Sequence, residues 1–245
     1  MASPCKSINL ACRIQLMKKI LFILLVISLP SAIKAQEADH LPGKLLFEDD
    51  FSKKLDTSQW LIEKIKADSE VVITKDGKLL VDTYGGATAW YKKELKGNIL
   101  ISYKRKVVLA GGKNDRLSDL NQFWMATDPI GNKLFKNSGG FAEYDSLNMY
   151  YVGMGGNYNT TTRFRKYNNG DKKIINEYKD TTHLLQANKE YLIQLQVKDG
   201  WVKFMVDGVD FFSWKDEHPY THGYFGIRAT RSTQEIDDVR IYQLE

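Results

Sequence analysis

The sequence predicts one all-β domain, an antiparallel sandwich of two sheets, that spans roughly residues 40–245. Short apolar or alternating runs follow one another from Lys44 onward and are separated by Gly, Asn and Asp, as strands are. No long stretch shows the roughly 3.6-residue apolar period of a helix. Many antiparallel strands are best closed as two stacked sheets or as a barrel. Three Asp-Gly pairs, a strong hairpin signal, stand between such runs: Asp76-Gly77, Asp199-Gly200 and Asp207-Gly208.

The first 35 residues are expected to be absent from the mature protein. Residues 17–35 place two lysines before an apolar run and end in small residues, the layout of a secretory signal peptide, with residues 1–16 as an upstream extension. The apolar run is too short for a spanning helix, which argues against the alternative of a membrane anchor. We therefore expect cleavage near Ala35 and an exported protein, periplasmic or extracellular, that is not held in the membrane.

Removal of this segment makes the chain electrically neutral. The full chain has 35 basic and 30 acidic residues, and five of the basic ones and none of the acidic ones precede residue 36. A neutral domain has no overall field to hold a polyanion, which argues against nucleic-acid binding. Both cysteines, Cys5 and Cys12, also lie in the removed segment. The exported protein is therefore expected to have no disulfide, thiolate metal site or cysteine nucleophile.

The expected strands lie mainly in residues 71–83, 98–110, 189–214 and 224–244, with a helical turn near residues 56–60.

The hairpin at 148–170, "NMYYVGMGGNYNTTTRFRKYNNG", is different because it concentrates tyrosine, threonine and arginine around a Gly-Gly-Asn turn. A strand pair that served folding alone would not need so many hydrogen-bonding and stacking groups. We therefore interpret this hairpin as the wall of a ligand site.

The ends of the strand region resemble those of concanavalin-A-like (laminin-G-like) jelly rolls: "LLFEDDFSKKLDTSQWLIEK" at 45–64 and "GYFGIRATRSTQEIDDVRIYQLE" at 223–245. Residues 119–129 and 150–170 are similar to a narrower set of secreted Bacteroidetes-type proteins associated with polysaccharide lyases. The resemblance covers nearly the whole mature chain. It implies a jelly-roll β-sandwich in a polysaccharide-degradation system, with a concave outer face that grips an extended ligand, but it assigns no catalytic residue.

Strand alternation sorts side chains between core and surface when the most apolar positions are taken as core-facing. This rule turns Phe164, Val152, Phe225 and Ile227 inward, and it also turns Phe123 and Met125 inward. If these strands are neighbours in one sheet, the residues that alternate with the inward-facing positions form one wall on its outer face. The side chains predicted to lie on this wall are Gln122, Trp124, Tyr151, Arg163, Arg165, Tyr167 and Arg228.

The chemistry of this predicted wall suits a polysaccharide, and we expect one that contains uronate units. Aromatic faces cover the C–H surface of a sugar ring, and arginine binds a carboxylate with two parallel hydrogen bonds. Gln122, Trp124, Tyr167 and Arg228 are the candidate substrate-binding residues. The plainer interpretation is that Tyr and Thr are simply good strand formers and that the arginines form a solvated face.

Cleavage of the glycan is the function favoured over binding alone, because binding modules are usually attached to another domain. In a polysaccharide lyase Arg163 and Arg165 would neutralise the uronate carboxylate, Tyr151 would donate a proton and His183 would be the base. His183 could equally be structural or merely exposed. A glycosidase is the rival enzyme, but Glu143 and Asp145 lack the second glutamate that its pattern requires. A non-catalytic carbohydrate-binding module and a structural or protein-interaction sandwich are the alternatives.

No cofactor is expected to be required. Two acidic groups near the ends of the strand region, residues 48–50 and 237–238, could hold a structural Ca²⁺, since hard cations take carboxylate ligands. Solvated acids at strand ends are the other explanation.

Overall fold

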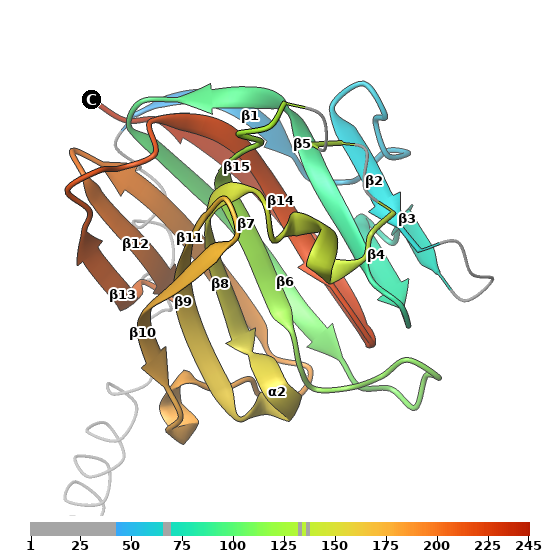
Figure 1. Ribbon diagram of the computed structural model, residues 1–245. Helices are drawn as coiled ribbons and strands as arrows, with labels where there is room; N and C mark the ends of the chain where they lie inside the picture. The colour runs from blue at the N-terminus through green and yellow to red at the C-terminus, as the bar shows by residue number, and fades with distance from the viewer. Residues whose placement is uncertain (1–42, 66–69, 132–133, 136–137) are drawn as a thin grey trace, which may run out of the picture. The chain divides into compact units, whose positions relative to one another are not determined.

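The computed structural model describes residues 43–65, 70–131, 134–135 and 138–245 (Figure 1). The expected signal peptide lies outside the described residues. No helix within the described part of the chain is long and apolar enough to cross a membrane.

Strands make up nearly all of the regular structure, with only three short helical turns among the described residues. The strands are β1 (Lys44–Asp49), β2 (Trp60–Lys64), β3 (Val71–Lys75), β4 (Lys78–Thr83), β5 (Ala87–Lys96), β6 (Ile99–Val108), β7 (Leu120–Thr127), β8 (Asn148–Gly155), β9 (Thr161–Asn168), β10 (Asp171–Tyr178), β11 (Glu190–Lys198), β12 (Trp201–Val206), β13 (Val209–Lys215), β14 (His222–Ala229) and β15 (Ser232–Gln243). The turns are η1 (Phe141–Tyr144), α2 (Gly156–Asn159) and η2 (Thr181–His183).

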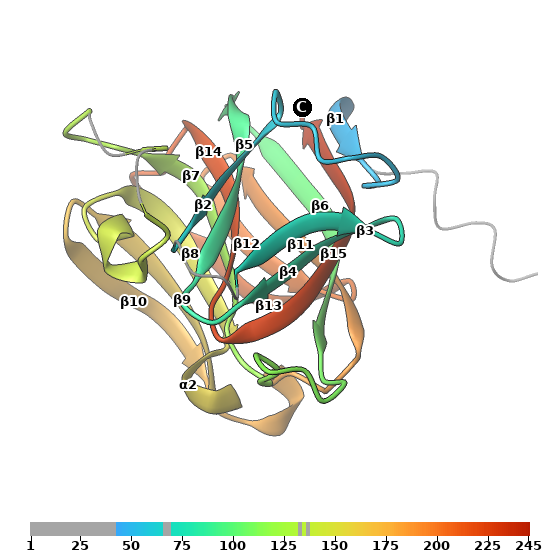
Figure 2. The same cartoon turned by 90° about the vertical axis from the view of Figure 1, so that its right-hand side faces the viewer.

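The strands form two antiparallel sheets that are stacked face to face (Figures 1 and 2). The first sheet has the order β13-β12-β11-β6-β15-β4-β3, with β1 paired to β15 beside this path. The second sheet has the order β10-β9-β8-β7-β14-β5-β2. The predicted fold class, an antiparallel two-sheet β-sandwich, is confirmed.

All three Asp-Gly pairs form tight hairpin turns between consecutive strands. Asp76, Asp199 and Asp207 have φ of 53°, 49° and 52°, and the glycine after each also has a positive φ. Two successive residues in the left-handed region define the turn whose twist matches that of the flanking strands, and Asp-Gly tolerates it well. These turns fix the registers of β3 with β4, β11 with β12 and β12 with β13.

The main hydrophobic core lies between the two sheets. Phe164 of β9 packs against Phe212 of β13, with ring centroids 5.7 Å apart, and on its other side it stacks on Trp124 at 5.9 Å. The predicted inward positions Phe164, Val152, Phe225 and Ile227 all belong to this core. Alternation therefore assigned β8, β9 and β14 to the correct faces.

Arg105 of β6 crosses the core and ties the two sheets together. Its Nε donates to Gln234 Oε1 on β15 at 2.8 Å, its Nη1 to the carbonyl of Asn121 on β7 at 2.7 Å, and its Nη2 to the carbonyl of Arg228 on β14 at 2.7 Å. All three acceptors are neutral. Complete burial lowers the pKa of Arg105 to about 10, so it remains protonated at neutral pH.

Candidate functional site

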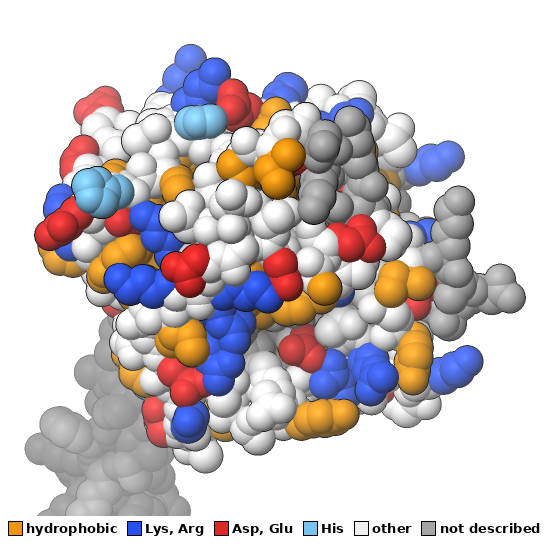
Figure 3. All heavy atoms as spheres, viewed as in Figure 1, with side chains coloured by type: hydrophobic (Ala, Val, Ile, Leu, Met, Phe, Trp, Pro, Cys, Tyr) orange, Lys and Arg blue, Asp and Glu red, His pale blue; other side chains and the backbone are white. Residues whose placement is uncertain are grey.

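The outer face of the second sheet, the side turned away from the core, carries the candidate site. Strand pairing aligns one outward position from each strand in a continuous row: Glu177, Arg163, Gly153, Asn121, Arg228, Thr88 and Glu63. A second aligned row is mostly apolar: Ile174, Arg165, Tyr151, Phe123, Gly226, Trp90 and Leu61. Figure 3 shows basic and acidic side chains gathered across the middle of this face.

The connection between β7 and β8 folds over one part of the outer face (Figure 1). Tyr144 of η1 packs against Phe123 and Trp90, with centroids 5.3 and 5.9 Å apart, so a second aromatic cluster forms outside the sheet. The hydroxyl of Tyr144 donates to Glu63 Oε2 at 2.9 Å, and Trp90 Nε1 donates to the same oxygen at 2.7 Å. The buried carboxylate of Glu63 thus anchors the connection to the sheet.

Two residues predicted to bind substrate lie beneath this layer of side chains. Arg228 points to the outer face as predicted, but it is only 1% exposed, because it donates to the carbonyl of Gly139 at 2.7 Å and lies under the Phe141 ring. Tyr167 also points outward and is 1% exposed, packed edge-on against Tyr151 at 5.7 Å. Both side chains point to the predicted face, but both are buried there in this arrangement.

Gln122 and Trp124 point to the opposite side from the one predicted. Trp124 is 1% exposed in the core between the sheets, stacked on Phe164. Gln122 is also buried there, where its Nε2 donates to the carbonyl of Val152 at 2.8 Å and its Oε1 accepts from Tyr103 at 3.0 Å. Neither side chain can line the outer face, so their assignment as substrate-binding residues is wrong.

Arg163 and Arg165 lie side by side on β9, on the uncovered part of the outer face. Arg163 Nε donates to Glu177 Oε1 at 2.5 Å, which fixes its guanidinium beside β10. Arg165 lies over the Tyr151 ring at 5.4 Å from its centroid, a cation–π contact. Among the described residues no carboxylate pairs with Arg165. Its positive charge is therefore available to an anionic ligand.

The Tyr151 hydroxyl lies between these arginines and β7. It donates to Asn121 Oδ1 at 2.9 Å, and it lies so close over Gly153 that a Cβ at that position would collide with it. Burial raises the pKa of Tyr151 above its ordinary value, so the hydroxyl is neutral at physiological pH. Tyr151 can therefore donate a hydrogen bond or a proton, but it is not a ready base.

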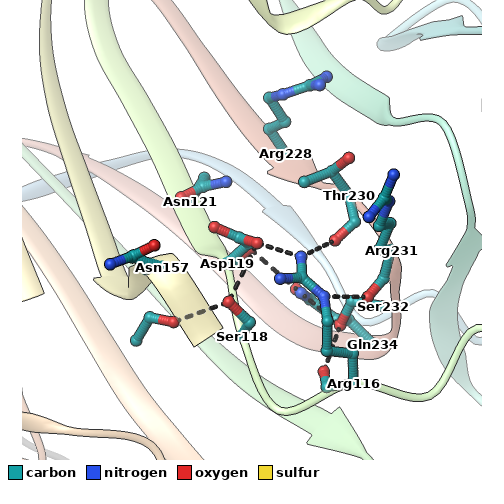
Figure 4. A network of polar contacts seen from close by, with 12 residues as sticks. Arg116, Ser118, Asp119, Asn121, Asn157, Arg228, Thr230, Arg231, Ser232 and Gln234 are labelled. Carbon is teal, nitrogen blue, oxygen red and sulfur yellow. Dashed lines mark hydrogen bonds and ion pairs between the residues drawn. The ribbon is translucent and has the colours of Figure 1, made fainter. Parts of the chain in front are cut away.

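A polar network closes the end of this region (Figure 4). Arg116 forms an ion pair with Asp119 and donates to the carbonyls of Thr230 and Arg231 at 2.9 and 3.0 Å. Ser118 Oγ donates to the same carboxylate oxygen of Asp119 at 3.0 Å. The figure shows the other oxygen of Asp119 directed away from both partners. The network therefore orients one carboxylate at the start of β7.

Tyr158 stands out from the turn between β8 and β9. Asn157, Tyr158 and Asn159 have φ of 53°, 59° and 59°, three left-handed residues in succession, and the side chain of Tyr158 is 67% exposed. Left-handed backbone costs about 1–2 kcal/mol for a residue with a Cβ, and such strain is often found at functional sites. The Arg116 guanidinium lies 5.1 Å from the ring centroid. The turn holds an aromatic ring in solvent at the end of the outer face.

His183 is not part of this arrangement. It belongs to η2, where its Nδ1 contacts Asp180 Oδ1 at 2.7 Å and its ring stacks on Tyr178 at 3.7 Å. Phe211 of the first sheet packs against the same ring at 4.6 Å. This places His183 at the edge between the two sheets rather than on the outer face. The structure brings together Tyr151, Arg163 and Arg165 and leaves the expected base elsewhere.

We expect His183→Gln to leave any ligand binding on the outer face unchanged, because the ring faces Tyr178 and Phe211 instead of the arginines. The same change should lower the free energy of unfolding by about 1 kcal/mol, through the lost stacking and the lost contact with Asp180. Calorimetric binding and a thermal melt measure the two effects. A loss of binding or cleavage in a variant that melts like the parent protein would contradict this structural role.

The other acidic candidates have structural partners. Glu143 lies in η1, not on a strand as its pattern required, and accepts from the backbone N–H of Ser138 at 2.6 Å, while Asp145 at the end of the same turn pairs with Lys172. Asp49 accepts from Trp60 Nε1 at 2.9 Å and Asp238 pairs with Lys104 at 2.9 Å. No three His, Cys, Asp or Glu side chains of the described residues gather in a group that could hold a metal ion.

Sequence reasoning missed Asn121, Asp119, Arg116 and Tyr158. Asn121 and Asp119 were missed because Phe123 was predicted to face the core, whereas it packs on the outer face; Met125, also predicted to face the core, does belong to it. Tyr158 could have been found, since it follows Gly-Gly-Asn, residues that favour a left-handed turn, and a turn of this kind leaves a bulky aromatic side chain in solvent. Arg116 gives no local signal.

The fold and this outer face define a galectin-like, jelly-roll β-sandwich. Residues 81–239 match the family model described as a domain of unknown function (DUF6250), and the chain belongs to that family. No curated protein matches the chain.

Solved structures share the fold at low sequence identity. A protein of unknown function with a galectin-like fold from Bacillus subtilis has a TM-score of 0.67 at 18% identity, covering 82% of this chain and 97% of its own. LamA from Zobellia galactanivorans, in complex with laminaritriose and laminaritetraose, has a TM-score of 0.60 at 16% identity, covering 82% and 100%. The carbohydrate-binding module CBM66 from Bacillus subtilis has a TM-score of 0.53 at 12% identity, covering 76% and 96%.

Proposed function

We propose that the protein is an exported carbohydrate-active protein of a polysaccharide-degradation system, and that it binds a uronate-containing glycan on the outer face of the second sheet. The observation that carries the proposal is Arg165, a cation stacked on Tyr151 without a carboxylate partner among the described residues. A uronate carboxylate accepts two parallel hydrogen bonds from a guanidinium, and such charge-assisted bonds are the strong ones. Arg163, already held by Glu177, would make a weaker second contact.

The surroundings of Arg165 supply the other contacts that a sugar chain needs. The exposed ring of Tyr158 offers a flat surface for C–H groups, and Asp119 offers a carboxylate oxygen for hydroxyls. Two proteins that share the fold support the class of ligand. One is a carbohydrate-binding module by name, and the other holds laminaritriose and laminaritetraose.

Binding fits the described face better than hydrolysis. Glycoside hydrolysis uses two carboxyl groups about 5–5.5 Å or roughly 6.5–9.5 Å apart. Among the described residues of the outer face, Glu63 is buried under the β7–β8 connection, Asp119 directly precedes β7, and Glu177 belongs to β10. These two strands are three strand spacings apart, roughly 14 Å. Asp119 and Glu177 are therefore too far apart to flank one glycosidic bond.

Cleavage by β-elimination is the second candidate, and the position of the Tyr151 hydroxyl favours it. In that reaction an arginine neutralises the uronate carboxylate, a base takes the C5 proton, and an acid protonates the oxygen that leaves C4 as the double bond forms. The neutral hydroxyl of Tyr151, beside Arg165, suits the acid. Incubation with uronate polymers distinguishes the candidates, since elimination produces an unsaturated, ultraviolet-absorbing end and hydrolysis produces reducing ends alone.

The proposed function is tested with Arg165→Gln, with Arg240→Gln on the first sheet as the matched control. We expect Arg165→Gln to weaken binding of an oligogalacturonate about tenfold or more by calorimetry. Its melting temperature should change little, because exposed charges contribute under about 1 kcal/mol. Arg163→Gln should have a smaller effect on binding. Unchanged binding in Arg165→Gln, or an equal loss in Arg240→Gln, would refute the assignment of this face.

A further inference from the structure

A separate hollow of about 380 Å³ opens at the edge of the sandwich, between β9 and β10 of the second sheet and the end of β13 of the first. Its volume is in the range of small-molecule sites. Trp214 forms part of its wall and Lys166 and Asp216 part of its base, and Asn168, Lys173 and His218 also line it. Trp214 is only half-buried, so part of its ring remains open. None of these residues belongs to the outer face described above.

The base of this edge hollow is held rigidly. Lys166 Nζ donates to Asp216 Oδ2 and to the carbonyl of His218, both at 2.7 Å, and Tyr150 donates to the same carboxylate oxygen at 2.7 Å. Burial acts to raise the pKa of Asp216, but the hydrogen bonds from Lys166 and Tyr150 outweigh it and hold this pKa below its ordinary value. The carboxylate of Asp216 is therefore charged at neutral pH, and Lys166 and Tyr150 hold it in place.

Lys166 keeps a hydrogen-bonding proton beyond these two bonds. An ammonium has three N–H donors, and the two described bonds use two of them. The nitrogen also lies 4.6 Å from the Tyr220 ring centroid and 5.7 Å from that of Trp214. A sugar ring makes two kinds of contact: hydrogen bonds through its hydroxyls and stacking of its C–H groups on aromatic rings. Lys166 provides the first kind, and the rings of Trp214 and Tyr220 provide the second.

The charges around the edge hollow indicate which sugars it would take. Three lysines and three acidic side chains line it, so its formal charge is zero. Such a lining has no net attraction for a uronate, unlike the unpaired Arg165. Its mixed donors and acceptors suit the hydroxyls of an uncharged sugar.

We propose that the edge hollow is a second saccharide site, which takes a single neutral pyranose unit against Trp214 and Lys166. The inference rests on the proposed function only for the class of ligand, since it uses different residues on a different side of the sandwich. A hollow of this size would hold a chain end or a side branch while the outer face holds the acidic part of the same glycan.

The test follows the indole N–H signals of the tryptophans by NMR while methyl β-D-glucopyranoside and methyl β-D-galactopyranoside are added. We expect a saturable shift of the Trp214 signal with at least one probe, identified by its loss in Trp214→Phe. Asn168→Ala, an exposed change at the rim, should weaken this binding several-fold without altering the melt. Trp201→Leu, which removes an exposed tryptophan outside the hollow, is the control and should have no effect.

The two sites can fail separately. Arg165→Gln should leave binding of the neutral methyl glycosides to the edge hollow unchanged. Asn168→Ala should leave binding of the oligogalacturonate to the outer face unchanged. The second site is refuted if neither probe shifts the Trp214 signal to saturation, or if Trp201 responds to the same extent. It is also refuted if galacturonic acid occupies the hollow more tightly than the neutral probes.

Discussion

Replacing Arg105 with methionine is expected to lower the free energy of unfolding by about 3–5 kcal/mol. Methionine fills similar space but leaves the oxygen of Gln234 and the carbonyls of Asn121 and Arg228 without their donor in a dry core. Each unsatisfied buried acceptor costs about 1–3 kcal/mol. For a domain of this size the melting temperature should fall by about 10 °C or more.

Chemical denaturation measures this loss, and Lys104→Met is the matched control because Lys104 is the neighbouring, partly exposed residue of β6. Arg105→Met combined with Gln234→Leu should lose less than the sum of the single changes, since the second change removes one of the orphaned acceptors. If Arg105→Met and Lys104→Met had the same free energy of unfolding, the hydrogen bonds that Arg105 makes between the sheets would contribute nothing to stability.

The second large effect is expected for Glu63→Leu, which should cost about 2–5 kcal/mol and release the β7–β8 connection. The change removes the oxygen that accepts from Trp90 and Tyr144, and each buried donor without a partner costs about 1–3 kcal/mol. Glu63→Gln keeps an acceptor oxygen at the same place and should lose much less.

Hydrogen exchange and limited proteolysis of the described residues between β7 and β8 report the release directly. In Glu63→Leu the protection of residues 138–147 should fall while that of β11 and β12 is kept, since these strands belong to the other sheet. Equal behaviour of the Leu and Gln variants, or a uniform loss of protection in every strand, would contradict an anchoring role for this carboxylate.

The fold was predictable because its signals are local. Asp76, Asp199 and Asp207 each precede a glycine between two strand runs, and a turn of this type requires only those two residues. Alternation was equally reliable on β9, where Phe164 is the single large apolar residue between two arginines. One apolar face and one polar face leave no doubt about orientation.

The same rule failed on β7 because both of its faces are apolar. Trp124 packs into the core between the sheets, and Phe123 packs into the aromatic cluster on the outer face. The register of β7 also shifts between Trp124 and Thr127, and Met125 has a φ of 52°, so simple alternation breaks there. Hydrophobicity cannot choose a face when a distant segment covers the outside as well.

The candidate site was predicted in part for a related reason. That Tyr151, Arg163 and Arg165 share a face followed from their own strands, but the covering of Arg228 depends on residues from another part of the chain. The position of His183 depends on which way η2 turns at the sheet edge, which its neighbours in sequence do not determine. Local patterns gave the direction of side chains, and long-range packing decided their exposure.

The position of β15 has a consequence for the order of events during synthesis. This strand follows every other described strand along the chain, yet it lies between β6 and β4 and also pairs with β1. Until β15 has left the ribosome, the first sheet therefore lacks its central strand. The edges of β1, β4 and β6 that pair with β15 keep unpaired backbone groups until then. Long-range pairing of this kind makes folding slow. A nascent chain of this protein should remain open to chaperones until β15 has been synthesised.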